Sequence, residues 1–221
     1  MRPPFTTQYF TRKKERNPMT SLLLLRHGQI KANREGRWHG STDSPMTRHG
    51  RRQARRTARH LATNHKRLSA IYTSPLQRCT DTASVVADRF QLTPVVIEGL
   101  SEYAIGEWED MPFQHLSEEL DFINRATSDL SFAPPGGESL KAVAGRIVTA
   151  MRDIGGRHEQ DDEQEQILIV SHGAVMAVAL GALLHTDPGR WTDYHFANCS
   201  LTELVLSESP YVNFFNSTQH L

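Results

Sequence analysis

The sequence predicts a single three-layer α/β domain, in which a mostly parallel sheet has helices on both faces. Short apolar runs with the length of buried strands alternate with segments whose apolar residues recur at helical spacing. The strand-like runs are residues 22–25, 70–72, 95–97, 167–170 and 201–206. Strand, helix, strand, helix along the chain is typical of a parallel sheet, because parallel neighbours are joined by crossover helices.

A basic leader precedes the first of these runs. Residues 1–19 have no apolar periodicity, and their five basic residues, against the single acid Glu15, are Arg2, Arg12, Lys13, Lys14 and Arg16. We expect a disordered leader. An organelle transit peptide, which is also rich in arginine and poor in acids, stays open as an alternative. Met19 is a second candidate for the true start, since the folded part is expected to begin near Thr20.

Two helices have clear patterns between the strands. Ser74-Pro75 is typical of an N-cap followed by proline at the first helical position. The apolar face of the helix after it comprises Leu76, Ala83, Val86, Ala87 and Phe90. A second apolar stripe at 3.6-residue spacing comprises Leu140, Val143, Ala144, Ile147, Met151 and Ile154. The acidic stretch 159–165 is expected to be a solvated loop.

Composition limits the class of protein. The 221 residues carry 25 Lys and Arg against 25 Asp and Glu, so we do not expect a generally cationic nucleic-acid-binding protein. The only cysteines, Cys79 and Cys199, exclude a disulfide scaffold and four-cysteine zinc modules. The longest aliphatic run, residues 22–25, is far shorter than the roughly 20 residues of a membrane span. We therefore expect a cytoplasmic protein.

Polar residues with matching chemistry follow three of the predicted strands. They are Arg26-His27-Gly28 after strand 22–25, Ser171-His172-Gly173 after strand 167–170, and Ser74 after strand 70–72, with Arg78 in the next helix. Catalytic loops gather at the carboxyl ends of strands in open α/β sheets, so these groups are expected at one edge. Their natural ligand is a phosphoryl group, because arginine binds phosphate oxygens bidentately and helix N-termini after Ser74 and Gly173 add positive dipole ends.

A second Arg-His-Gly copy, at residues 48–50, opens a helix instead of following a strand, so we expect His49 on a helix surface. The same helix carries six arginines: Arg48, Arg51, Arg52, Arg55, Arg56 and Arg59. An exposed, solubilising helix is the main interpretation. A surface for a polyanion or a partner is the alternative.

Further motifs accompany the strand-end residues in a fixed order. They are Asn33; Gly40, Asp43, Met46-Thr47, Gly50 and Gln53-Ala54; Ser74-Pro75-Leu76-Gln77-Arg78 with Thr82-Ala83; Leu100-Ser101-Glu102 with Gly106 and Trp108; Gly136-Gly137-Glu138-Ser139; and Asn198-Cys199-Ser200. From about residue 21 to 206, this set resembles the histidine phosphatase superfamily, in its phosphoglycerate mutase-like branch with Arg-His-Gly and Ser-His-Gly motifs. The resemblance implies one such domain over residues 20–221, with a small helical cap at about 103–135.

The resemblance also implies roles for these residues. His27 would be the nucleophile; it must be neutral to attack, with a backbone carbonyl on its other nitrogen, and it would become a phosphohistidine. The side chains expected around the phosphoryl oxygens are Arg26, Asn33, Arg78 and His172. Glu102 would protonate the leaving oxygen and then activate water, since a nearby phosphate dianion favours the protonated carboxyl. The acid-phosphatase branch has an aspartate directly after its second histidine, where Gly173 stands here, so Glu102 is the matching acid.

The other residues assigned to substrate binding are Ser74, Gly173, His39 and Trp108. For His39 a surface position is the alternative. Four aromatic residues either line an apolar specificity pocket or pack the cap: Trp108, Phe113, Phe122 and Phe132. Glu107, Glu109 and Asp110 lie close to Glu102 in sequence, so its assignment depends on the surrounding motif. The remaining histidines have no metal-ligand spacing, and we expect neither a metal nor a cofactor.

Hydrolysis is the predicted reaction. A mutase must hold the carboxylate of a phosphoglycerate and protect phosphohistidine from water, and both demands call for basic residues in the cap. Between Tyr103 and Pro135, however, Arg125 stands alone against seven acids, and residues 101–106 depart from the Asn-Glu-x-x-Tyr-Gly pattern of mutases. We predict a phosphomonoesterase for a small phosphorylated metabolite, with no nucleic-acid or membrane partner; a homodimer stays open. The alternatives are a cofactor-dependent phosphoglycerate mutase and a non-catalytic phosphate-binding or regulatory relative.

Overall fold

The computed structural model describes residues 20–64, 67–158 and 165–221. The expected leader, with Met19, and residues 159–164 of the acidic stretch lie outside the described residues. The described strands are β1 (Thr20–Arg26), β2 (Arg67–Thr73), β3 (Val95–Val96), β4 (Glu165–Ser171), β5 (Leu201–Leu206) and β6 (Tyr211–Ser217). The described helices are α1 (Lys31–Glu35), α2 (Arg48–Asn64), α3 (Gln77–Phe90), α4 (Phe113–Glu118), α5 (Phe122–Ser128), α6 (Leu140–Arg157) and α7 (Gly173–His185), with short 3₁₀ helices η1 (Glu98–Leu100), η2 (Gly106–Trp108) and η3 (Pro188–Asp193).

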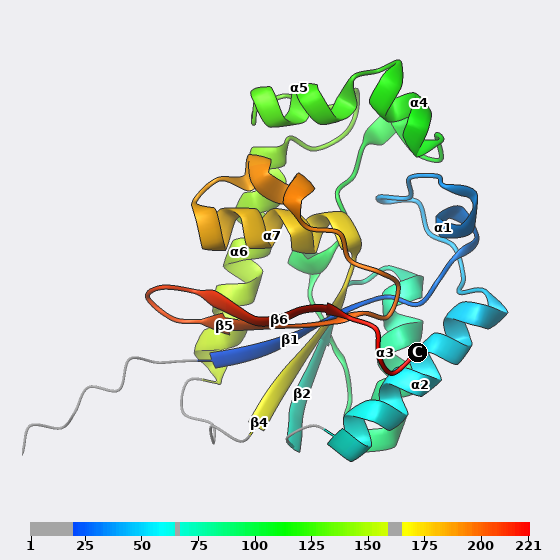
Figure 1. The fold of residues 1–221 in the computed structure, drawn as a ribbon, viewed down its shortest axis with the longest axis vertical. Coiled ribbons are helices and arrows are strands. Elements are labelled where there is room, and N and C mark those ends of the chain that lie inside the picture. The colour runs from blue at the N-terminus through cyan, green and yellow to red at the C-terminus, as the bar shows by residue number, and fades with distance from the viewer. Residues whose placement is uncertain (1–19, 65–66, 159–164) are drawn as a thin grey trace, which may run out of the picture.

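One mixed sheet, in the order β3-β2-β4-β1-β5-β6, runs through the middle of the domain (Figure 1). Strands β1, β2, β3 and β4 pair in parallel, whereas β5 and β6 are antiparallel to their neighbours. The predicted α/β fold class is therefore confirmed. Strand β6 was not predicted, because its apolar residues are interrupted by Asn213 and Asn216 on an edge that is only partly buried.

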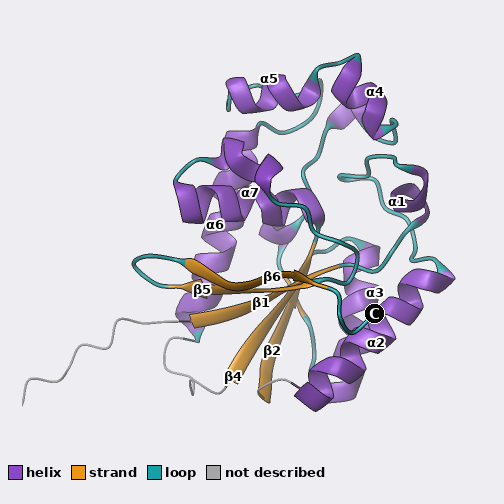
Figure 2. Cartoon of the chain, viewed as in Figure 1, coloured by secondary structure: helices purple, strands orange, loops and turns teal. Residues whose placement is uncertain are grey.

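Helices cover both faces of the sheet, with α6 and α7 on one face and α2 and α3 on the other (Figure 2). Successive side chains of a strand point to opposite faces, so a strand buried on both sides must be apolar at every position. In β1, Leu22 and Leu24 pack in the core with α6 and α7, while Leu23 and Leu25 pack in the core with α2 and α3. This alternation explains the unbroken leucine run.

The predicted start of the helix after Ser74 is wrong. Helix α3 begins at Gln77, and the Ser74 hydroxyl is hydrogen bonded to His172 Nε2 at 2.7 Å as well as accepting from the Leu76 N–H at 3.3 Å. The Gln77 N–H instead donates to the carboxylate of Asp43, a residue far away in sequence. A tertiary contact thus caps this helix, which local sequence patterns cannot show.

Helices α4 and α5 lie above α7 and the loop around α1, at the end of the domain where β1 and β4 terminate (Figure 1). Leu116, Phe122 and Ala126 anchor the two helices in the core that contains α6 and α7. These short helices occupy the range predicted for the cap, although the domain boundaries stay a prediction. In the described part of the chain, no helix combines the length and the apolar character that crossing a membrane requires.

Two glycines allow the chain after His27 to cross the first turn of α2 at very short range. A Cβ atom at Gly50 would lie 2.3 Å from the Gln29 carbonyl oxygen, and one at Gly28 would lie 2.7 Å from the Gly50 oxygen. Backbone atoms cannot swing aside as a flexible side chain can, so these contacts fix glycine at both positions. The loop that carries His27 is therefore tied to the position of α2.

We expect Gly50→Ala to lower the free energy of unfolding by about 1–3 kcal/mol, because the added methyl group forces the two backbones apart. Gly145→Ala is the matched control: it lies in α6 with nothing within 4 Å of an added Cβ. That change should raise stability by about 0.5–1 kcal/mol through reduced backbone entropy of the unfolded chain. Urea denaturation of both variants measures the difference, and equal effects would contradict the proposed close approach.

Candidate active site

The sheet order brings the three motif-bearing strand ends together. Strand β4 lies between β2 and β1, and Arg26 of β1 is the register partner of Ser171 of β4. The His27 N–H donates to the Ser171 carbonyl at 3.0 Å, and the Ser74 N–H donates to the Val170 carbonyl at 3.0 Å. The rings of His27 and His172 consequently meet edge to face, with centroids 5.2 Å apart.

His27 is almost completely buried, with 3% of its surface exposed. Its Nδ1 lies 2.9 Å from the Gly28 carbonyl oxygen, which can only accept a hydrogen bond, so Nδ1 carries the proton and Nε2 keeps its lone pair. Burial lowers the pKa of His27 well below its ordinary value, and the positive charges of Arg78 and Arg26 lower it further. The ring is therefore a neutral imidazole with a basic Nε2, which is the form that a nucleophile needs.

His172 is fully buried, and both of its ring nitrogens are occupied within the protein. Nδ1 accepts from Arg78 Nε at 3.1 Å, so Nε2 carries the hydrogen that is donated to the Ser74 hydroxyl at 2.7 Å. Burial is the largest cause that lowers the pKa of His172 well below its ordinary value, followed by the charge of Arg78. His172 is thus a neutral side chain that is fixed in place and packs against His27 on the side away from the cavity.

Arg78 is also fully buried, and its three nitrogens make five hydrogen bonds. One goes to His172. The other four go to the loop after α1: to the carbonyl oxygens of Thr42 (2.7 Å), Gly40 (2.7 Å) and His39 (3.1 Å), and to the Asp43 carboxylate (3.5 Å). A direct contact between Arg78 and a ligand would require one of these bonds to be exchanged.

Glu109 holds the same loop from its other side. Its carboxylate accepts hydrogen bonds from the N–H groups of Gly40, Ser41 and Thr42, at 2.9 to 3.1 Å, and from that of Ile105 at 3.2 Å. Burial opposes ionisation, but these backbone bonds outweigh it, and the pKa of Glu109 is lowered. Since its N–H groups are bound to Glu109, the loop presents its carbonyl groups to Arg78.

Arg26 and Asn33 line a cavity beside His27 with their guanidinium and amide groups. The Arg26 guanidinium donates through Nη1 to the Phe196 carbonyl, while its buried Nε has no partner among the described residues. It lies so close to Gly173 that a Cβ there would come within 3.3 Å of it. The Asn33 oxygen accepts from Asn198 Nδ2 at 3.0 Å and from the Ile30 N–H at 3.1 Å, which leaves the Asn33 Nδ2 donors for a ligand.

The carboxylate of Glu102, which is 8% exposed, lies at the N-terminus of α7. It accepts hydrogen bonds from the N–H groups of Val175 at 2.7 Å and Ala174 at 3.1 Å, and from its neighbour Tyr103 at 2.9 Å. Burial lowers the pKa of Arg26, whereas the negative charge of Glu102 acts in the opposite direction. Glu102 is therefore both fixed in place and electrostatically coupled to Arg26.

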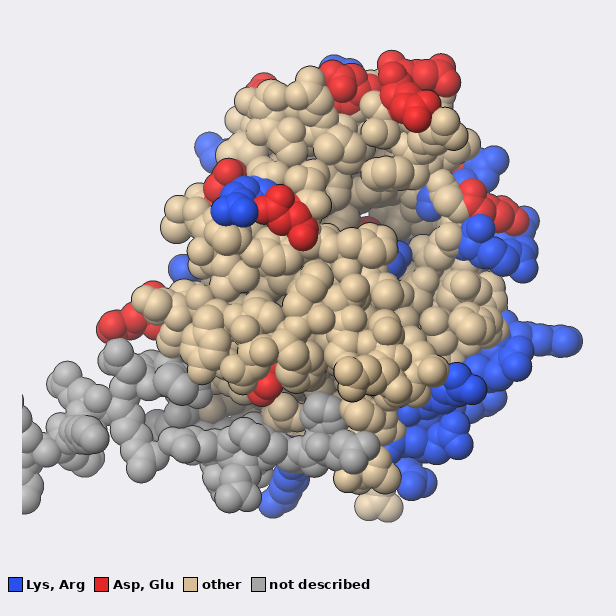
Figure 3. Space-filling view, viewed as in Figure 1, with Lys and Arg blue, Asp and Glu red and all other residues tan. Residues whose placement is uncertain are grey.

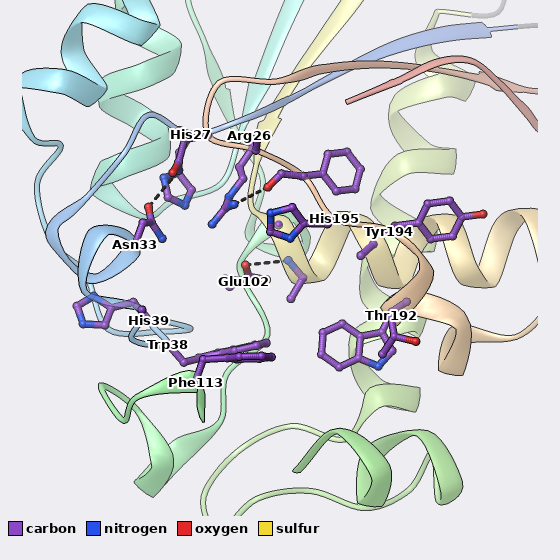
Figure 4. A pocket seen from close by; sticks show the side chains of 18 of the residues that line it. Arg26, His27, Asn33, Trp38, His39, Glu102, Phe113, Thr192, Tyr194 and His195 are labelled. Atoms are coloured by element: carbon purple, nitrogen blue, oxygen red, sulfur yellow. Dashed lines mark hydrogen bonds between the residues drawn. The ribbon is translucent and has the colours of Figure 1, made fainter. Parts of the chain in front are cut away.

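A cavity of about 690 Å³ opens beside these groups. Its lining includes six residues that the sequence assigned to the site, Arg26, His27, Asn33, His39, Glu102 and Gly173. Figure 4 shows Arg26, His27 and Asn33 on one side of this space, with Glu102 next to them. Figure 3 shows the hollow on the same face of the molecule, below α4 and α5. Arg78, His172 and Ser74 lie behind this lining, without being part of it.

Trp108, which the sequence assigned to substrate binding, is not in the cavity lining either. It packs against Phe122 and Phe132, with the Arg125 guanidinium over the Phe132 ring at 4.0 Å. Of the four aromatic residues considered for a specificity pocket, Phe113 alone lines the cavity. Trp108, Phe122 and Phe132 pack against one another in the cap, which was the alternative to lining a specificity pocket.

Sequence reasoning missed much of the cavity lining, namely Arg37, Trp38, Ile123, Trp191, Thr192, Tyr194, His195 and Phe196. Most of these come from η3 and the irregular segment after it. Their spacing follows neither a helical nor a strand period, so a single sequence gives no signal for them. Among the described residues, no group of three or more His, Cys, Asp or Glu side chains is arranged to hold a metal ion.

The arginine-rich helix forms no part of the cavity. Its six arginines and His49 are exposed, as expected for a solvated helix. Figure 3 shows Lys and Arg side chains gathered along the side of the domain where α2 lies. The alternative that this surface binds a polyanion stays open.

Comparison with known proteins matches residues 22–216 to the family described as histidine phosphatase superfamily (branch 1). A bifunctional protein of Mycobacterium tuberculosis is 32% identical over 210 residues, covering 93% of this chain and 56% of that protein, so this chain spans little more than half of that relative's length. Phosphoserine phosphatase 1 of Hydrogenobacter thermophilus is 29% identical over 206 residues, covering 92% of this chain and 95% of that protein. The solved structure of mycobacterial glucosyl-3-phosphoglycerate phosphatase with VO3 has a TM-score of 0.79 and 26% identity, covering 90% of this chain and 100% of that one.

The lowered pKa of His27 predicts a pH dependence of stability. A histidine whose folded pKa is depressed contributes stability above its unfolded pKa of about 6.5, and this contribution is lost as the pH falls below that value. His27→Asn removes the titrating group, so between pH 6.5 and 5 its unfolding free energy should fall less steeply than that of the wild type, by up to about 1.4 kcal/mol per pH unit. Denaturation midpoints over this range measure the slope. The exposed His49→Asn variant should keep the wild-type slope; if His27→Asn also keeps it, His27 is not a buried neutral base.

The contacts of Glu109 predict that Glu109→Gln destabilises the loop after α1. An amide has one acceptor oxygen and places N–H donors where backbone N–H groups already point, so we expect a loss of about 1–3 kcal/mol. Because the folded pKa of Glu109 is lowered, the charge stabilises the protein above the unfolded pKa of about 4.3, and this is lost as the pH falls through the folded pKa. The difference between variant and wild type in chemical denaturation should therefore shrink below pH 4. Glu107→Gln is the matched control, and equal effects of the two changes would contradict the assignment.

Proposed function

The chain belongs to branch 1 of the histidine phosphatase superfamily, and on that premise we propose that it is a phosphomonoesterase that hydrolyses a small phosphorylated metabolite through a phosphohistidine on His27. One observation carries the proposal: the Nδ1 of this buried, neutral imidazole is held by the Gly28 carbonyl, which leaves Nε2 as the basic nitrogen beside the cavity. Relatives named phosphoserine phosphatase and glucosyl-3-phosphoglycerate phosphatase support the reaction class.

The phosphoryl group would lie between His27 and the N-terminus of α7. Arg26 Nε and Asn33 Nδ2 have no hydrogen-bond partner among the described residues, and the absence of a side chain at Gly173 leaves room for the guanidinium beside the start of α7. Arg78 adds positive charge from behind and positions His172, which in turn packs against His27. This arrangement would stabilise negative charge on the transferring oxygens, which is the main requirement of phosphoryl transfer.

The proposed reaction has two steps. The lone pair of His27 Nε2 attacks phosphorus, the bond from phosphorus to the ester oxygen breaks, and the carboxyl group of Glu102 gives its proton to the departing alcohol. Water then attacks the phosphohistidine, the phosphorus–nitrogen bond breaks, and Glu102 takes a proton from that water. Phosphate leaves, and His27 and Glu102 return to their starting forms.

Glu102 is the acidic residue that shares the described cavity lining with His27 and Arg26. It is the one acidic residue in the described cavity lining, whereas Glu109 is bound to the loop after α1 and Asp110 is bound to His39 and Arg37. The free enzyme holds Glu102 through three backbone N–H groups, a setting that suits a carboxylate.

The cap supports hydrolysis over mutase chemistry. Its one arginine, Arg125, lies over the rings of Phe132 and Trp108 and outside the cavity lining, so it is not placed to hold a substrate carboxylate. The cavity also opens at the hollow visible in Figure 3, so the proposed phosphoryl site is not sealed from solvent. Both features favour transfer of the phosphoryl group to water.

The test is a phosphate-release assay over a panel of small monoesters, with a chelator present throughout. We expect turnover in the presence of the chelator, no turnover for His27→Ala, and unchanged turnover for the exposed control His49→Ala. Glu102→Gln should lower kcat by about 10²–10⁴-fold for alkyl esters but much less for p-nitrophenyl phosphate, whose leaving group needs little protonation. Rapid interconversion of 3- and 2-phosphoglycerate with negligible phosphate release would instead identify a mutase.

A further inference from the structure

The cavity has a second wall, which the proposed chemistry does not use. Across the cavity from the phosphoryl site, the lining includes apolar side chains from separate parts of the fold: Trp38, Phe113, Ile123 and Trp191. In Figure 4, the labelled rings of Trp38 and Phe113 lie across the space from Arg26 and His27, with Glu102 between the two sides. A monoester with its phosphoryl group at His27 would therefore direct its alcohol portion towards this wall.

Trp38 and Phe113 together form a flat aromatic surface. Their rings are nearly parallel, with an interplanar angle of 13° and centroids 6.1 Å apart. Trp38 is fixed from behind, because its Nε1 donates to the Tyr103 carbonyl at 3.2 Å and its ring meets Phe122 and Trp191 edge to face. Phe113 remains 44% exposed, which is unusual for a large apolar side chain and leaves apolar area for a ligand to cover.

The charges around this wall are already neutralised. Apart from Arg26, which belongs to the phosphoryl site, Arg37 is the one Lys or Arg in the described lining, and it is bound to the Asp110 carbonyl with the Asp110 carboxylate 3.9 Å away. His39 shares the same carboxylate, at 2.9 Å. No cation of the described lining is left unpaired to meet a carboxylate or a second phosphate on the alcohol, and burying such a charge without a partner is costly.

The remaining polar groups suit hydroxyl or heteroatom contacts. Thr192 and His195 line the cavity, and the Tyr194 hydroxyl is held by His185 Nε2 at 2.7 Å. A volume of about 690 Å³ exceeds what an amino acid or a three-carbon acid fills, and it lies within the range of pockets that enclose ligands with one or more rings.

We propose that the natural leaving group is an uncharged alcohol that carries a planar aromatic group, which stacks on the surface formed by Trp38 and Phe113. This proposal rests on the proposed phosphomonoesterase function and specifies its substrate class. It separates this chain from relatives named for phosphoserine and glucosyl-3-phosphoglycerate, substrates whose alcohol portions carry a carboxylate.

The test compares kcat/KM for esters of alcohols with similar acidity, so that chemistry stays constant while the alcohol portion varies. Ethyl, benzyl and 2-naphthylmethyl phosphate form the neutral series, and phosphoserine and 3-phosphoglycerate are the anionic substrates. We expect kcat/KM to rise about tenfold or more from ethyl to benzyl phosphate and to rise again for the naphthyl ester, because each ring adds apolar contact area. Both anionic esters should be poorer substrates than benzyl phosphate.

Phe113→Ala tests the wall itself. It should reduce the ratio of kcat/KM for benzyl phosphate to that for ethyl phosphate by about tenfold, mainly through KM, and Phe113→Leu should give an intermediate ratio because it keeps apolar area without the ring. Tyr211→Ala is the matched control, since Tyr211 is an aromatic residue of similar exposure on β6, outside the cavity lining. It should leave the ratio unchanged.

The outcomes separate this inference from the function on which it rests. Equal kcat/KM across the neutral series, a preference for phosphoserine or 3-phosphoglycerate, or a ratio insensitive to Phe113→Ala would overturn the aromatic substrate class and leave the phosphomonoesterase assignment intact. Absence of phosphate release from every ester, p-nitrophenyl phosphate included, would overturn the proposed function and this inference together.

Discussion

The site depends on one buried cation, the guanidinium of Arg78. Burying an unpaired charge costs several kcal/mol, so the fold must supply acceptors around it. It does so with His172 from the end of β4 and with carbonyl groups of the loop after α1, whose N–H groups are bound by Glu109. Three parts of the chain that are distant in sequence thus share one electrostatic requirement. The same loop contains Trp38 and His39, which line the cavity, so Arg78 helps to fix part of a lining to which it does not itself belong.

The positive charge that organises the loop also lowers the pKa of His27, the proposed nucleophile. Arg78 and Arg26 lie close enough to His27 and His172 to add to the effect of burial, and together these keep both imidazoles neutral. A cationic surrounding would normally be a poor place for a base, but it is a favourable place for a phosphoryl group. One arrangement therefore keeps His27 neutral and favours binding of the group that it is proposed to attack. Glu102, at the N-terminus of α7, is the acidic residue of the described cavity lining, and a bound phosphate would lie beside its carboxyl group.

The strands other than β6, and the polar residues that follow them, could be predicted from the sequence, because a strand buried on both faces leaves an unbroken apolar run such as Leu22 to Leu25. The start of α3 could not be predicted from the sequence. The first N–H group of this helix donates to Asp43, which is distant in sequence, and the Ser74 hydroxyl is hydrogen bonded to His172. Much of the cavity lining could not be predicted either. Trp191 lies in the short 3₁₀ helix η3 and Phe196 in the irregular segment after it, where no period marks them, and Trp108, which belongs to a recognisable motif, packs against Phe132 instead. Local patterns predicted residues that the sheet brings together at one edge, whereas tertiary packing decides which residues line the rest of the cavity.

The central claim is that the free nitrogen of His27, Nε2, carries the phosphoryl group during turnover. The most direct measurement is to quench the enzyme in alkali during steady-state hydrolysis, where phosphohistidine survives, and to locate the phosphoryl group by mass spectrometry and ³¹P NMR. We expect a single modified residue, His27, with phosphorus on Nε2 because Nδ1 is held by the Gly28 carbonyl. Phosphorus on Nδ1, on another residue, or on no residue at all while phosphate is being released would contradict the central claim.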